Sequence, residues 1–260
     1  MNRDSPNRPR PVSCMPCLAG SNRVEVGLFM DEEMLPLTIV SASRYGEKDF
    51  FERSALGRSL SQAYSGFPVK SKIYFNNTKP MPTCYNDAIS NTANAEEIFV
   101  FVHDDVYIVD WFWIDIISSG FKKFDILGIA GNKRRLPMQT SWAFTDESWT
   151  WDHPSNLSGI VGHGRQFPCE LSIFGPPDQE CKLLDGVFLA TKKATLEKSN
   201  MKFDETFDFH FYDLDFCRQA EERKLRMGTI PLSIIHESGG TFGSPEWRVN
   251  RDKYINKWKE

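Results

Sequence analysis

The sequence lacks an excess of positive charge. Its 260 residues carry 31 lysines and arginines against 35 aspartates and glutamates, which gives a formal net charge of −4. Proteins that bind nucleic acids usually present a basic face. The charge balance therefore gives no reason to expect a nucleic-acid partner.

Long apolar runs and a regular cysteine pattern are also missing. No window approaches the ~18 apolar residues of a membrane span, and the N-terminus has no charged-then-apolar signal peptide. The six cysteines have no regular spacing, and no second pair of zinc ligands follows the Cys14-x-x-Cys17 pair. We therefore expect reduced thiols, no membrane span and a cytoplasmic location.

Composition divides the chain into three parts. Residues 1–23 are rich in proline, arginine, asparagine and serine, which predicts a disordered N-terminal tail. Residues 24–240 are expected to form a single domain, and 241–260 a C-terminal extension. Within the domain, residues 133–180 are rich in tryptophan and aperiodic, which is typical of a binding loop or lid.

From residue 37 onward, strand and helix patterns alternate. Strands are expected at 37–43, within 70–81, and at 98–102, 124–132, 187–191 and 229–238. Helices are expected at 47–64, at 84–93, from 193, and from 213 to a stop at Gly228. This order predicts an α/β fold with a mostly parallel central sheet and helices on both faces.

Three of the expected strands end in polar residues. These ends are Ser41-Ala42-Ser43, Asn76-Asn77 and His103-Asp104-Asp105. His103-Asp104-Asp105 follows an apolar run typical of a buried strand, and carboxylates are rarely buried in a protein core without a partner. Because ligands of parallel sheets bind beyond the carboxyl ends of strands, three polar ends at one edge favour a binding site.

Further polar groups stand at turns and element ends in the second half of the chain. They are Asp185, Asp213 and His236. With Asp104 and Asp105 they make a set of hard carboxylate oxygens and one imidazole, which suits Mg²⁺ or Mn²⁺ better than a thiolate-bound metal. Such an ion keeps positions open for water and substrate phosphates.

The order of these motifs resembles that of nucleotide-sugar glycosyltransferases of the GT-A fold, close to the family-2 group. The resemblance covers residues 36–240 and is greatest to a bacterial glycosyltransferase-like branch with a His-x-Asp-Val motif. "FVFVHDDV" is similar to the family's strand and DxD element, and "LLDGVFLATKK" to its Asp-Gly segment beneath the acceptor site. "FDETFDFHFYDLDFC" is similar to the element that bears the general base, and "IIHESGG" to the strand that ends in a histidine.

The resemblance implies a Rossmann-like GT-A catalytic domain within 24–240. It also implies metal-dependent, inverting transfer of a sugar from a nucleoside-diphosphate sugar, such as a UDP-sugar, to a glycan or lipid-linked glycan. In this reading Asp213 is the general base, and Asp105 and His236 bind Mn²⁺ or Mg²⁺. We expect the helix N-terminus to lower the pKa of Asp213 and keep it ionised.

The remaining candidate residues divide between the two substrates. Asp104 would face the nucleotide, and the first two strand ends are placed to hold its base and ribose, namely Ser41, Ala42, Ser43, Asn76 and Asn77. On the acceptor side, Asp185 and Gly186 would lie beneath the acceptor. Trp149 and Trp151 would either stack on sugar rings or pack the long middle segment down.

Two positions differ from the family pattern. His103 occupies the first acidic position of the DxD element, and Tyr212 replaces the glutamate that precedes the base. The Gln-x-x-Arg-Trp motif of processive polysaccharide synthases is absent, and so are their membrane helices. The resemblance therefore implies an enzyme that makes single transfers.

Three other functions fit part of the pattern. A sugar nucleotidyltransferase would need a glycine-rich loop after the first strand, whereas "SASRYGEKD" has a single glycine. A metal-dependent hydrolase would usually need more than the five histidines present. A non-catalytic carbohydrate-binding protein with a degenerate GT-A site would use Trp142, Trp149 and Trp151. The residues at positions 103 and 212 keep this last alternative open.

Overall fold

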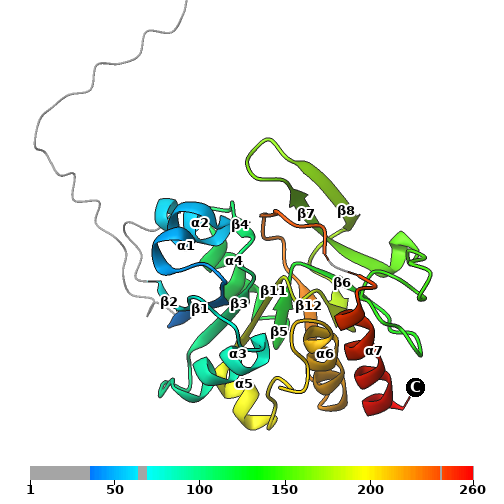
Figure 1. The fold of residues 1–260 in the computed structure, drawn as a ribbon. Helices are drawn as coiled ribbons and strands as arrows, with labels where there is room; N and C mark the ends of the chain where they lie inside the picture. The colour runs from blue at the N-terminus through cyan, green and yellow to red at the C-terminus, as the bar shows by residue number, and fades with distance from the viewer. Residues whose placement is uncertain (1–35, 64–68, 241, 260) are drawn as a thin grey trace, which may run out of the picture. The chain divides into compact units, whose positions relative to one another are not determined.

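A computed structural model describes residues 36–63, 69–240 and 242–259 (Figure 1). The tail expected at 1–23 lies outside the described residues. Seven strands form a first sheet, sheet A, in the order β2 (Lys70–Tyr74), β1 (Leu37–Ala42), β3 (Ile98–Val102), β11 (Phe188–Lys192), β5 (Ile126–Gly128), β12 (Met227–Thr229) and β9 (Glu180–Cys181). The α/β class is thereby confirmed.

Sheet A is mixed rather than mostly parallel. Strands β2 and β3 run parallel to β1, and β12 runs parallel to β5, but β11 is antiparallel to both β3 and β5. Phe188 at the start of β11 pairs with Val102 at the end of β3. The backbone N–H of His103 also donates to Val187 O over 3.2 Å. Residues that precede β11 therefore meet residues that follow β3.

A second sheet, sheet B, was not expected from the sequence. Its order is β10 (Leu183–Leu184), β6 (Ala130–Asn132), β7 (Leu157–His163), β13 (Ile234–His236) and β4 (Val106–Ile108), and β8 (Glu170–Gly175) pairs with β7. Figure 1 shows β7 and β8 side by side as a hairpin. The range 133–180 therefore contains regular strands, contrary to the expectation of an aperiodic loop.

Glycines explain why this hairpin was missed. β7 contains two glycines and β8 ends in a third, and glycine lowers the strand propensity of a sequence. Gly159 has a φ of 110°, and a Cβ there would lie 2.0 Å from Ile129 O. β7 therefore needs a glycine at this position to approach the chain beside β6, although glycine lowers the strand propensity of the sequence.

The helices are α1 (Glu47–Arg53), α2 (Ala55–Ala63), α3 (Met81–Ser90), α4 (Trp113–Gly120), α5 (Lys193–Lys198), α6 (Tyr212–Glu222) and α7 (Pro245–Trp258). In Figure 1, α1, α2 and α4 lie on one side of the strands of sheet A, and α3, α5 and α6 on the other. None of the described helices is both long and apolar enough to span a bilayer.

The bounds of three helices differ from expectation, and α3 lies at Met81–Ser90 instead of 84–93. The helix expected at 47–64 is divided at Ser54, whose hydroxyl donates to Phe50 O and accepts from Gly57 N. Such side-chain bonds offer the backbone an alternative to a continuous helix. The last long helix ends at Glu222, and Gly228 lies in β12 instead of stopping a helix.

An aromatic cluster between α3, β3 and α6 positions the first turn of α6. Phe203 stacks on Phe216 with ring centroids 4.3 Å apart, and it lies edge-to-face against Phe101 and Tyr85. All four rings are fully buried. Because burial of one such ring contributes about 1.5–3 kcal/mol, this cluster holds α6 firmly against the sheet.

Helix α7 packs on α6 within the same folded unit. It begins at Pro245, after Ser244 caps the helix by accepting a hydrogen bond from Trp247 N. At its other end, the indole N–H of Trp258 donates to Asp215 Oδ1 over 3.0 Å, and Lys257 Nζ lies 2.6 Å from the same oxygen. Helix α7 therefore supports the helix that carries Asp213.

Candidate active site

Three side chains from the β3–β4 turn and the end of β13 form a cluster that fits a metal ion. His103 and Asp105 lie in the turn between β3 and β4, and His236 ends β13, where it pairs with Val106 of β4. His236 Nε2 lies 3.3 Å from Asp105 Oδ2, and His103 Nδ1 lies 4.0 Å from Asp105 Oδ1. One donor atom from each residue lies within 4.8 Å of the others.

The Asp105 carboxylate has the properties of a metal ligand. Its Oδ1 is buried and makes no hydrogen bond to any of the described residues, so an unpaired acceptor points into the cluster. Burial acts to raise the pKa of Asp105, but the hydrogen bond and charge of His236 outweigh it and hold that pKa at about 2. Asp105 is therefore ionised at neutral pH and available to a cation.

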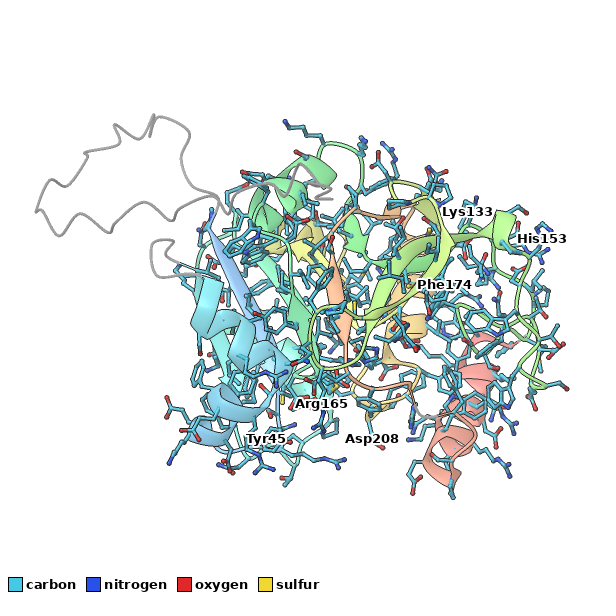
Figure 2. The ribbon with its side chains drawn as sticks, turned by 90° about the horizontal axis from the view of Figure 1, so that it is seen from above. Tyr45, Lys133, His153, Arg165, Phe174 and Asp208 are labelled. Carbon is cyan, nitrogen blue, oxygen red and sulfur yellow. The ribbon has the colours of Figure 1, made fainter. Side chains whose placement is uncertain are left out.

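One cavity extends from this cluster across the ends of β1 and β2. It has a volume of about 900 Å³. Of the residues expected to bind the nucleotide, it is lined by Ala42, Ser43, Asn77 and Asp104. We call it the donor cavity. Figure 2 labels Tyr45 and Asp208, which also line it and lie on the same side of the molecule.

Asp104 and Ser43 are joined within the donor cavity. The Ser43 hydroxyl donates to Asp104 Oδ2, and burial raises the pKa of the Asp104 carboxyl. Two other residues from the sequence analysis do not line this cavity. Ser41 is fully buried in β1, and Asn76 occupies a turn with a φ of 48°.

A second cavity, of about 340 Å³, lies on the other side of the cluster. It is lined by Asp185, Gly186, Asp213 and His236, and we call it the acceptor cavity. Aromatic rings form much of its wall, namely Trp142, Phe144, Trp151, Phe174, Phe209, Phe211, Tyr212, Phe242 and Trp247. The two cavities adjoin, because His103, Phe209 and His210 line both.

Asp213 stands in the first turn of α6 and faces the acceptor cavity. Phe211, the residue before the helix, has a φ of 68°, and this turns Tyr212 and Asp213 toward Gly186. Burial, and then the charge of Asp185, raise the pKa of Asp213 to about 7. The lowered pKa expected from the helix N-terminus is wrong, because burial outweighs the helix dipole here.

Asp185 is held in one orientation by two hydrogen bonds. The indole N–H of Trp142 donates to its Oδ2 over 2.8 Å, and Val187 N donates to its Oδ1 over 3.0 Å. Both oxygens are therefore occupied by donors. This arrangement suits a carboxylate that orients a neighbouring group better than one that takes up a proton.

The two tryptophans expected at the acceptor site have different surroundings. Trp151 lines the acceptor cavity, is 56% exposed and stacks on Phe174, which Figure 2 labels. Trp149 does not line this cavity and instead packs against Phe144 and Trp247. Trp151 is therefore placed to contact a ligand, whereas Trp149 belongs to a packed aromatic group.

Sequence reasoning missed two parts of the site. It assigned His103 no role in binding the metal, although this residue lies in the metal cluster. It also missed Phe174 and His163, which reach the acceptor cavity from the β7–β8 hairpin. The position of His103 in the motif was a usable signal, but nothing in the local sequence marked the hairpin residues.

Three solved structures are similar to this chain at low sequence identity. TarS from S. aureus shares 15% identity, covering 85% of this chain and 64% of that one, with a TM-score of 0.47. GalNAc-T7, solved with UDP, GalNAc and Mn²⁺, shares 8% identity, covering 87% and 48%, with a TM-score of 0.48. A197 from STIV shares 12% identity, covering 78% and 86%, with a TM-score of 0.43. The chain thus spans less than two thirds of TarS and about half of GalNAc-T7.

The sequence has no significant match among curated proteins. A family model does match, over residues 67–256, and that range holds the metal cluster, Asp185 and Asp213. The match confirms the resemblance to glycosyltransferases that the motifs indicated. This chain belongs to the glycosyltransferase-like family.

Proposed function

We propose that this protein transfers a sugar from a nucleoside-diphosphate sugar to a hydroxyl group of a glycan or lipid-linked glycan. The transfer depends on a divalent ion and inverts the anomeric centre. The observation that carries the proposal is the position of two carboxylates in adjoining cavities. Asp105, with an unpaired buried oxygen, lines the donor cavity, and Asp213, with a raised pKa, lines the acceptor cavity.

On the donor side, the protein holds the nucleotide and prepares the leaving group. Ser43, Asn77 and Asp104 offer polar atoms to the nucleoside at the ends of β1, β2 and β3. Asp105 and His236 are the residues that would hold Mn²⁺ or Mg²⁺, together with His103. When bound, such an ion supplies positive charge that offsets the negative charge growing on the diphosphate.

On the acceptor side, Asp213 removes the proton from the attacking hydroxyl. A pKa of about 7 lets this carboxylate accept a proton near neutral pH, and a general base of this kind contributes about 10²–10⁴-fold to the rate. Asp185, fixed by Trp142, orients the acceptor. The aromatic wall offers flat apolar surfaces that suit sugar rings.

The test is a panel of nucleotide sugars offered with Mn²⁺, with Mg²⁺ and with a chelator. We expect calorimetry to show nucleotide-diphosphate binding that needs the ion, and NMR to show an inverted anomeric configuration in the product. Asp105→Ala should abolish the response to the ion. Asp208→Ala, which removes another carboxylate from the same cavity, is the control and should retain it.

Two results would overturn the proposal. One is nucleotide binding by Asp105→Ala that equals the parent and keeps its response to metal. The other is binding of glycan alone, without any response to nucleotide, which a non-catalytic carbohydrate-binding protein would show. The hydrogen bond between His103 and Tyr212 favours a working site over a degenerate one, because both unusual residues take part in one ordered network.

A further inference from the structure

We infer that Tyr212 is a positioning residue that makes His103 the third metal ligand, so that the site prefers a transition-metal dication to Mg²⁺. The inference rests on the proposed metal-dependent transfer and deepens it. Neither residue is acidic, although both occupy acidic positions of the family pattern. The structure brings these two departures into direct contact.

The hydroxyl group of Tyr212 bridges two partners. Its oxygen lies 2.9 Å from Gly186 O and 2.9 Å from His103 Nε2. A carbonyl oxygen can only accept, so the single phenol proton is donated to Gly186. The Tyr212 oxygen must then accept from His103, which places the imidazole proton on Nε2. The lone pair of the neutral ring is therefore on Nδ1.

The hydroxyl cannot easily turn away from this arrangement. Tyr212 is fully buried, and its ring packs against Tyr85 and Phe203, with centroids 5.9 and 6.0 Å away. The hydroxyl occupies space that only a glycine leaves free, because a Cβ on Gly186 would lie 2.6 Å from the Tyr212 oxygen. On the other side, the His103 ring lies against Phe209, with centroids 5.5 Å apart. The histidine is thus held in one orientation by packing as well as by the hydrogen bond.

The freed Nδ1 atom faces an acceptor instead of a donor. It lies 4.0 Å from Asp105 Oδ1, which is buried and unpaired among the described residues. Two lone pairs at this distance with no proton between them favour a cation. His236 Nε2, 3.3 Å from Asp105 Oδ2, supplies the third donor. Histidine ligands usually donate their second ring N–H to a fixed acceptor, and Tyr212 is that acceptor for His103.

The resulting donor set is two imidazoles and one carboxylate. Mg²⁺ prefers oxygen ligands and binds imidazole poorly, whereas the affinity of a site with nitrogen ligands rises from Mn²⁺ along the first-row dications. An aspartate at position 103 would have kept a harder, oxygen-rich site. The histidine therefore shifts the preference of the site from Mg²⁺ toward transition-metal dications. This shift depends on Tyr212, which keeps the proton on Nε2 and leaves Nδ1 free to bind the ion.

The test begins with the metal-free protein. Nitrogen-15 NMR of the His103 ring should show the Nε2–H tautomer in the parent, and this preference should be lost in Tyr212→Phe. Calorimetric titration should show Mn²⁺ bound at least about 10-fold more weakly by Tyr212→Phe, a typical effect of losing the partner of a metal-binding histidine. Binding of Mg²⁺ should change less, so the Mn²⁺ preference should fall.

Two controls separate positioning from loss of structure. Phe216→Leu disturbs the buried aromatic cluster beside Tyr212 without removing a polar atom from the Tyr212–His103 network, and it should leave Mn²⁺ affinity unchanged. His103→Gln removes the imidazole itself and should weaken Mn²⁺ at least as much as Tyr212→Phe. Because Tyr212 acts through His103, the double variant should bind Mn²⁺ no more weakly than His103→Gln alone.

Parental Mn²⁺ affinity in Tyr212→Phe, an Nδ1–H tautomer in the parent, or additive losses in the double variant would each overturn the inference. None of these readouts requires turnover. A parent that binds Mn²⁺ through this network but acts on no nucleotide sugar would refute the proposed function and leave the inference standing. A parent that transfers sugar normally while Tyr212→Phe keeps full Mn²⁺ affinity would refute the inference and leave the proposed function standing.

Discussion

The backbone N–H of Gly186 donates a hydrogen bond to Oδ2 of Asp213 over 3.0 Å. This bond joins the turn before β11 to the first turn of α6. It depends on the absence of a side chain, because a Cβ on Gly186 would lie 2.8 Å from the Cβ of Asp213. The same contact brings Asp213 close to Asp185, whose charge helps to raise the pKa of Asp213.

Asp213→Asn should reduce turnover by about 10²–10⁴-fold while nucleotide-sugar binding stays close to that of the parent. The amide keeps the shape of the side chain but cannot accept the proton of the acceptor hydroxyl. In the parent, kcat/KM should fall as pH drops below about 7, where Asp213 becomes protonated. Near-normal turnover in the variant would move the role to Asp185, for which Asp185→Asn is the parallel measurement.

The raised pKa of Asp213 also predicts how stability depends on pH. The folded protein binds this proton more tightly than the unfolded chain, since the pKa is about 7 instead of 3.8. The contribution of Asp213 to the free energy of unfolding therefore falls as pH rises from about 4 to about 7. Asp213→Asn removes the penalty and should be more stable than the parent by about 2–4 kcal/mol at pH 8.

Urea unfolding at several pH values measures this difference. The gain should shrink toward pH 4, where the unfolded chain of the parent also begins to bind the proton at Asp213. A gain that is the same at pH 4 and pH 8 would show that the carboxyl has an ordinary pKa. It would also remove the electrostatic argument for Asp213 as a base tuned to neutral pH.

Trp151→Ala and Trp149→Ala should have separable effects. Trp151 is exposed in the acceptor cavity, so its loss should raise the KM for the acceptor about 3–10-fold, with little change in melting temperature. Trp149 packs in the aromatic group, so its loss should lower the free energy of unfolding by about 2–4 kcal/mol. Equal losses of stability from both changes would argue against a ligand contact by Trp151.

Asp215→Asn should affect stability and spare the chemistry. Asp215 is fully buried and accepts hydrogen bonds from Trp258 and Gln219 beside its ion pair with Lys257. The change weakens these contacts and should cost about 1–3 kcal/mol in unfolding free energy, while folded protein keeps its turnover.

Asp204→Asn is the matched control for Asp215→Asn. Asp204 also pairs with Lys257, but its side chain is partly exposed, so the cost in stability should be smaller. A loss of turnover in Asp215→Asn as large as that in Asp213→Asn, at unchanged stability, would make Asp215 the better candidate for the base.

The donor half of the site could be predicted from the sequence because its signals are local. The apolar run of β3 and the three polar residues that follow it are contiguous, and their placement at a sheet edge follows from the strand itself. The alternation of strands and helices likewise fixed the α/β class. Local periodicity does not carry strand direction, however, so the antiparallel β11 and the whole of sheet B could not be predicted.

The acceptor half depends on contacts between distant parts of the chain. The pKa of Asp213 could not be judged from its helix position, because burial and Asp185 come from outside that helix. The metal-ligand geometry of His103 depends on Tyr212, which the chain reaches only after β11. The nucleoside-diphosphate sugar donor, the glycan or lipid-linked glycan acceptor and the cytoplasmic location stay predictions.

The segment between Ala130 and Asp185 also bears on how such proteins can diverge. The chain departs at Ala130 and returns at Asp185, and the N–H of Asp185 donates to Ala130 O over 2.9 Å, so the two ends of the excursion meet. A segment whose ends are already joined can be lengthened, shortened or exchanged at a small cost in loop-closure entropy. This excursion carries Trp142, Trp151 and Phe174 to the acceptor cavity, while the residues that line the donor cavity lie outside it. Recombination of one contiguous stretch of the gene could therefore change the wall of the acceptor cavity while the lining of the donor cavity stayed the same.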